Sequence, residues 1–211
     1  VTPKTLVSAE PNLRTDAATP RVNTLSSHSA YLKISEGCDN TCAFCIIPTL
    51  RGKQRSRTIA DVVAEAQLLA SQGVVEINLV AQDLTAYGHD LVDKPDLASL
   101  LAALGRVPYL RCVRCHYAYP RQLSGNLLCQ LATGKNTLPY LDMPVQHCSN
   151  AVLRRMRRGR GQHKLKELLH RVRDDVPDVV LRSSLIVGFP GESDAEFEEL
   201  RHFVDEMRFE R

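Results

Sequence analysis

Three cysteines within one short segment carry the clearest chemical signal in this sequence. Cys38, Cys42 and Cys45 form a C-x₃-C-x₂-C pattern directly after an apolar, strand-like segment. Three thiolates on one loop can face a single metal centre. A structural zinc site is closed by four protein ligands, whereas a 4Fe–4S cube held by three cysteines leaves one iron with an open coordination position. Three cysteines therefore favour a reactive centre over a structural one.

A zinc site remains the alternative interpretation of the same cysteines. Another Cys or His from elsewhere in the chain would then complete the ligand set. In that case the chain would be a non-catalytic module that binds nucleic acid or protein.

The residues around the cysteines extend the pattern. Phe44 precedes the last cysteine, the run 31–37 precedes the first, and Ile46-Ile47-Pro48 with Arg51-Gly52 follow. The three-cysteine pattern with this aromatic residue resembles the signature of the radical S-adenosylmethionine (SAM) superfamily. The flanking residues resemble its methylthiotransferase branch, most closely the RimO family, from about residue 30 to the end of the chain.

This resemblance implies two bound groups. The three cysteines would hold a 4Fe–4S cluster, and SAM would chelate its free iron. An electron from a reductase would then cleave SAM and leave a deoxyadenosyl radical. Apart from the cluster ligands no catalytic residue is assigned, and the expected SAM-binding residues are Phe44, Asp83, Gln146, Arg182, Gly188 and Gly191. The alternatives are ordinary rim hydrogen bonds for the polar side chains and a tight strand-to-helix turn for the glycines.

The resemblance also implies a substrate. RimO enzymes add a methylthio group to the β-carbon of an aspartate in a small-subunit ribosomal protein. Gln82-Asp83 favours this reaction over that of the MiaB-like tRNA methylthiotransferases, which usually have Gln-Asn at this place. A second 4Fe–4S cluster is expected only in the full-length enzyme, where an upstream domain would supply its ligands.

Composition fits a globular protein of the cytoplasm. The 211 residues are 44% hydrophobic and 24% charged, and no apolar stretch is long enough to span a bilayer. The seven cysteines, an odd number, favour a reducing compartment. A net charge of +3 does not by itself indicate nucleic acid. The basic run 154–160 indicates either contact with RNA or an acidic partner, or a solvated helix face.

The segments from residue 30 onward alternate between strand-like and helix-like patterns. Strands are expected near 30–35, 75–81, 109–116, 139–145 and 179–187. Helices are expected at 59–70, 97–104, 122–132, 150–158, 164–176 and 197–207, with capping boxes at Thr58–Asp61 and Ser193–Glu196. This alternation predicts an α/β fold, a partial (β/α) TIM-like barrel with parallel strands and outer helices.

Two regions follow from this division. Residues 1–29 are interpreted as a linker or irregular lead-in, and 30–211 as a radical SAM core. Because the chain begins with Val1 and a further strand is due near Phe209, we expect a fragment that stops before its last βα unit.

The polar segments agree with a barrel. Polar or glycine-rich residues follow each expected strand, and the C-terminal ends of barrel strands meet at one rim. Of the remaining cysteines, Cys112 and Cys115 should point to opposite faces of a strand. Cys129 is expected in or near the core, and Cys148 is either reactive or an inert substitution.

Overall fold

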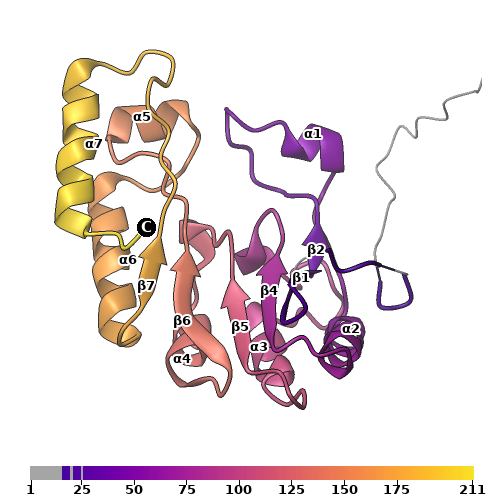
Figure 1. Cartoon of the computed structure of the whole chain (residues 1–211). Helices are drawn as coiled ribbons and strands as arrows, with labels where there is room; N and C mark the ends of the chain where they lie inside the picture. Colours follow the sequence, from indigo (N-terminus) through magenta and orange to yellow (C-terminus); the bar gives the residue numbers. More distant parts are fainter. Residues whose placement is uncertain (1–15, 20, 25) are drawn as a thin grey trace, which may run out of the picture.

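Five parallel strands form the centre of the molecule, in the order β1-β4-β5-β6-β7 (Figure 1). The computed structural model describes residues 16–19, 21–24 and 26–211. The strands are β1 (Ser29–Lys33), β4 (Glu76–Val80), β5 (Cys112–Cys115), β6 (Thr137–Asp142) and β7 (Val180–Arg182). Each neighbouring pair runs parallel. The predicted α/β partial barrel is therefore confirmed.

Helices alternate with the strands along the chain. They are α2 (Ile59–Ser71), α3 (Leu97–Leu104), α4 (Gly125–Thr133), α5 (Asn150–Arg155), α6 (Gln162–Asp175) and α7 (Asp194–Met207), with short 3₁₀ turns η1 (Leu84–Ala86) and η2 (Pro120–Gln122). Helix α4 begins later than predicted, because η2 takes the preceding residues and Ser124 caps the helix.

The two predicted capping boxes differ in the structure. At α7 the box is complete, since Ser193 and Glu196 bond reciprocally. At α2 only half of it forms: Thr58 accepts from the amide of Asp61. The carboxylate of Asp61 binds Arg57 and the amide of Ala17 instead.

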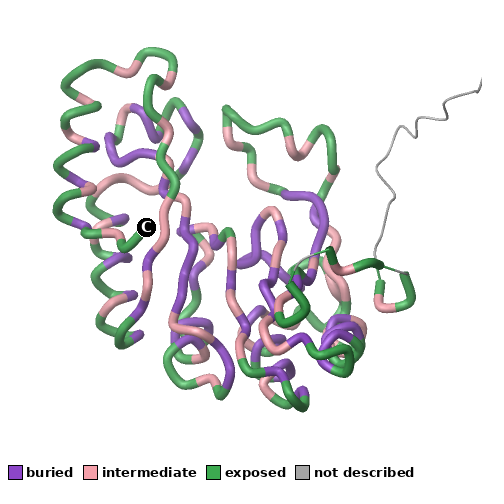
Figure 2. Tube along the Cα trace, viewed as in Figure 1, coloured by how far each residue is buried: buried purple, intermediate pink, exposed green. Residues whose placement is uncertain are grey.

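Alternation along the strands separates an apolar face from a polar one. Leu32, Leu79, Val113 and Leu141 are fully buried in the main core. Figure 2 shows the buried stretches running along the strands and the inner sides of the helices. Alternate positions carry polar groups that bond to one another across strands, such as Arg182 with Asp142 at 2.5 Å.

Three short elements above the sheet were not predicted. Strands β2 (Ser35–Glu36) and β3 (Arg55–Ser56) pair in antiparallel fashion, and helix α1 (Ile47–Arg51) lies between them. In Figure 1 these elements lie beyond the arrowheads of the central strands. Two-residue strands give no detectable period, so their existence depends on tertiary pairing.

The edges of the described chain are also informative. The parts of 16–28 that the structure describes contain no helix or strand; the other residues assigned to the lead-in, 1–15, 20 and 25, lie outside the described residues.

At the other end, the amide of Arg211 donates to Leu181 O at 3.3 Å, and Ser183 N donates to Arg211 O at 2.9 Å. This parallel pairing along β7 occurs where a further strand was expected. None of the described helices has both the length and the apolar character needed to cross a membrane.

Candidate functional site

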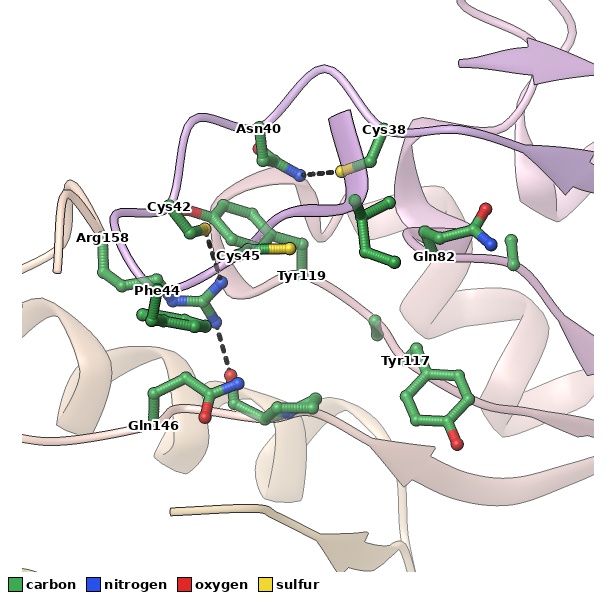
Figure 3. A pocket seen from close by; sticks show the side chains of 14 residues that line it. Cys38, Asn40, Cys42, Phe44, Cys45, Gln82, Tyr117, Tyr119, Gln146 and Arg158 are labelled. Carbon is green, nitrogen blue, oxygen red and sulfur yellow. Dashed lines mark hydrogen bonds between the residues drawn. The ribbon is translucent and has the colours of Figure 1, made fainter. Parts of the chain in front are cut away.

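The three cysteines line one cavity at the C-terminal ends of the strands (Figure 3). Its volume is about 370 Å³. The wall comes from the cysteine loop and from the loops after β4, β5 and β6, as the rim argument predicted. The lining residues are Cys38, Asn40, Cys42, Phe44, Cys45, Ile47, Ala81, Gln82, Tyr117, Ala118, Tyr119, Pro144, Gln146 and Arg158.

The composition of this wall bears on the kind of centre it could hold. Among the described lining residues there is no His, Asp or Glu and no fourth Cys. Within the described part of the chain, no group of three or more His, Cys, Asp or Glu side chains is placed so that it could hold a single metal ion. A cube differs from a single ion because each cysteine binds a different iron atom. Three separated sulfurs around one cavity, without a fourth ligand, fit a cube better than zinc.

A close backbone contact holds the start of the cysteine loop. Gly37 has φ of +84°, and a Cβ at this position would lie 2.2 Å from Lys53 O. The next amide, Cys38 N, donates to Gly52 O at 3.2 Å. Only glycine tolerates both the conformation and the approach. The unpredicted β2–β3 pair therefore closes the loop and directs its cysteines into the cavity.

Asn40 contacts one of the candidate sulfur ligands. Its Nδ2 donates to Cys38 Sγ at 3.3 Å and to Asp83 Oδ2 at 2.7 Å. Burial raises the pKa of the Cys38 thiol. Sequence reasoning did not select Asn40, although its position between two cysteines is a usable signal.

Asp83 has a different place from the one expected. It is 2% exposed, and it accepts from Thr85 N at 3.0 Å and from Thr85 Oγ1 at 2.6 Å, capping η1. It is not among the residues that line the cavity. Its role in the structure is to hold Asn40, and direct contact with SAM stays a prediction that these contacts do not favour.

Arg158 contacts a second candidate ligand. Its Nη1 lies 3.6 Å from Cys42 Sγ, and its Nη2 donates to Pro144 O at 2.5 Å. The guanidinium stacks over the ring of Tyr119, 4.2 Å from its centroid. The sequence placed Arg158 within a basic run, yet it is 9% exposed whereas Arg154 and Arg157 are exposed. Its burial depends on tertiary packing and has no signal in the sequence.

Two of the expected SAM-binding residues, Phe44 and Gln146, line the cavity. Phe44 is partly exposed. Gln146 and Tyr117, which also lines the cavity, have φ of 68° and 64°. Non-glycine residues in this left-handed region cost about 1–3 kcal/mol each and concentrate at functional sites.

The other three expected residues lie outside the cavity wall. Arg182 pairs with the buried Asp142. Gly188 and Gly191 both have positive φ and belong to a turn in which Glu192 accepts from Phe189 N at 2.9 Å. The buried His147 lies 3.3 Å from the same carboxylate. These contacts fit the alternative interpretation, a tight strand-to-helix turn, and SAM binding by these residues stays a prediction.

The remaining cysteines have no part in the cavity. Cys112 and Cys115 occupy strand positions of opposite parity, the first half-buried and the second buried, as predicted. The prediction of a core position for Cys129 is wrong, since it is exposed. Cys148 is fully buried, and burial raises the pKa of its thiol to about 11, which favours the inert alternative.

Comparison with known proteins identifies the family to which the chain belongs. The model of the Radical SAM superfamily matches residues 32–204. The chain belongs to the radical SAM superfamily. Solved structures share the fold: the radical S-adenosylmethionine methyltransferase TsrM from Kitasatospora setae superposes with a TM-score of 0.68 at 16% identity, covering 85% of this chain and 34% of that one. Methylornithine synthase (PylB) gives 0.60 at 12% identity, covering 87% of this chain and 52% of that one.

Two of the similar curated proteins carry the same name. "Ribosomal protein uS12 methylthiotransferase RimO" from Anaeromyxobacter sp. (strain Fw109-5) is 58% identical over 208 residues, which are 99% of this chain and 44% of the relative. The protein of the same name from Myxococcus xanthus (strain DK1622) is 56% identical over 205 residues, 97% of this chain and 43% of the relative. The radical SAM chain thus spans less than half the length of these curated relatives.

Proposed function

We propose that Cys38, Cys42 and Cys45 ligate a 4Fe–4S cluster and that SAM binds the iron they leave free. The observation that carries this proposal is a cavity lined by three cysteines, with no fourth metal-binding side chain among its described lining residues. When bound, the cluster and SAM supply a carbon-centred radical that abstracts hydrogen from an unactivated carbon. Membership of the radical SAM superfamily supports both cofactors.

In this proposal the chain's own residues bind and orient SAM and shield the site from water. Phe44 provides an aromatic surface for the adenine, and Gln146 offers an amide to the polar part of SAM. Asn40 fixes the Cys38 side of the loop through its bond to Asp83. The cavity's largely apolar wall, which includes Ile47, limits the access of water to the radical.

We further propose that the full-length protein adds a methylthio group to the β-carbon of an aspartate in ribosomal protein uS12, in the cytoplasm. The names of the relatives at 58% and 56% identity support this substrate over tRNA. The proposal includes a reductase as electron donor and a second 4Fe–4S cluster in the longer protein. Residues 30–211 then act as the radical SAM core, and 1–29 lead into it.

SAM cleavage tests the first part of the proposal. Anaerobically reconstituted chain, reduced with dithionite, should convert SAM to methionine and 5′-deoxyadenosine. Alanine at any one of the three positions should abolish this conversion, whereas Cys129→Ala should retain it. Cleavage by a chain that lacks Cys42 would contradict the proposal.

Substrate choice needs the full-length enzyme. Assays with a uS12-derived peptide and with tRNA, followed by mass spectrometry, should show a gain of one methylthio group on the peptide only. Modification of the tRNA would overturn the uS12 assignment and leave the cofactor site unaffected.

A further inference from the structure

Arg158 carries a buried positive charge. None of the described residues that it contacts at the cavity is a carboxylate. It is 9% exposed, and the described residues that line the cavity with it include neither Asp nor Glu. A buried charge without a compensating charge is costly. The bonds to Pro144 O and the ring of Tyr119 satisfy part of the guanidinium. Its Nη1, directed at Cys42 Sγ, indicates that the missing negative charge belongs to the occupant of the cavity.

We propose that Arg158 is a positioning residue that donates a hydrogen bond to the cluster-ligating sulfur of Cys42 and places a fixed positive charge beside the cluster. This inference rests on the proposed ligation by Cys42. A cluster bound by three thiolates carries net negative charge, so it supplies the counter-charge that the protein wall lacks.

The local fold explains how Arg158 comes to face the loop. After α5, Arg157 adopts φ of 57°, and Arg158 N donates back to Leu153 O at 2.9 Å. The same turn presents Met156 O to Ala43 N at 3.0 Å. The end of α5 therefore contacts the cysteine loop twice, once through the backbone and once through the guanidinium. In Figure 3 the Arg158 side chain lies between Cys42 and Gln146.

The planar fork of arginine is required for this arrangement. Nη1 and Nη2 bind Cys42 Sγ and Pro144 O at the same time, while the plane stacks on Tyr119. A lysine has one compact donor head and no plane, so it keeps the charge but does not reproduce all three contacts.

The expected consequence is electronic. Hydrogen bonds to cluster sulfurs, and positive charge near them, stabilise the form that carries one more electron and so raise the reduction potential. Arg158 therefore favours transfer of one electron from the reductase to the cluster. No bond to Arg158 forms or breaks, and its proton stays on the guanidinium.

Redox titration of the reconstituted chain, followed by electron paramagnetic resonance, tests this role. We expect a more negative midpoint potential in Arg158→Gln than in wild type, with Arg158→Lys between the two. Arg154→Gln is the matched control, because Arg154 is exposed on α5 and bonds to Asn150 O; its potential should equal that of wild type. Iron and sulfide are measured in every sample.

The outcomes separate this inference from the proposed function. Wild-type protein without a 4Fe–4S cluster would end the proposed function itself. A loaded wild type together with loaded Arg158→Gln at the wild-type potential would overturn only the role of Arg158. Should Arg158→Gln fail to fold or load, Arg158→Lys decides: a wild-type potential overturns the inference, and a lower one supports it.

Discussion

At the scale of the residue, the sequence identified the three cysteines that line the cavity but not the side chains that contact their sulfurs. Cys38, Cys42 and Cys45 are recognisable because their spacing is local. Asn40 contacts the sulfur of Cys38 two residues away, but Asp83, which holds Asn40, lies 43 residues further along the chain. Arg158 contacts the sulfur of Cys42 across 116 residues of sequence. Such contacts arise only when the chain is folded. Asp83, for which SAM contact stays a prediction, is not among the described residues that line the cavity and bonds to Asn40 instead.

Thiol accessibility is a direct test at this scale. In the metal-free chain, iodoacetamide should modify the exposed Cys45 and Cys129 early, while Cys115 and Cys148 should react only on unfolding. Burial raises the pKa of the last two thiols to about 12 and about 11, so both access and thiolate fraction oppose reaction. Peptide mass spectrometry over time measures the order. Alkylation of Cys148 as fast as that of Cys129 would contradict the buried assignment.

At the scale of the element, regular periodicity predicted the long helices and the central strands. The same reasoning missed β2, β3 and α1, the short elements that position the cysteine loop, because pairs of residues show no period. It also placed the start of α4 too early, since Ser124 rather than an earlier residue supplies the cap. The elements closest to the site were thus the hardest to predict.

Gly37→Ala tests the closure of the cysteine loop. Its positive φ and the 2.2 Å approach of Lys53 O should make this substitution destabilising by roughly 1–3 kcal/mol or more, with reduced iron loading. Gly125→Ala is the control, because nothing lies within 4 Å of its added Cβ at the start of α4. Chemical denaturation and iron analysis give the two readouts. Equal stability and loading for both variants would refute the closure argument.

Glu196 links α7 to α5 and gives a test by pH. Its pKa is lowered to about 2, first by the Ser193 amide and further by the Ser193 hydroxyl and Arg155. A carboxyl with a lowered pKa stabilises the folded state fully above its ordinary value of 4.5 and loses that effect as pH falls toward 2. The melting temperature of wild type should therefore exceed that of Glu196→Gln at neutral pH, and the difference should vanish near pH 2. A difference that persists there would contradict the capping role.

At the scale of the whole molecule, the alternation of strands and helices predicted a parallel sheet and a shared rim. The structure has both, and the rim carries the cavity. The sequence did not predict which of the residues at the rim line the cavity. Whether Gly188, Gly191 and Arg182 face the cavity depends on how the loop and strand that contain them pack. The loops after β1, β4, β5 and β6 line the cavity, and the loop after β7 forms a turn supported by Glu192.

The division of labour between this chain and a longer enzyme is testable at the same scale. We expect the chain alone to cleave SAM without methylthiolating a uS12 peptide, because the described cavity has ligands for one cluster only. Liquid chromatography with mass spectrometry detects both products in one reaction. A methylthiolated peptide from the chain alone would show that sulfur insertion needs no second cluster.

Iron and sulfide analysis of anaerobically reconstituted chain tests the central claim most directly. We predict about four irons and about four sulfides per chain and a broad absorbance at about 400 nm. Alanine at Cys38, Cys42 or Cys45 should remove both, and Cys129→Ala should leave them unchanged. A colourless protein that holds zinc through four protein ligands, or that holds no metal, would contradict the assignment.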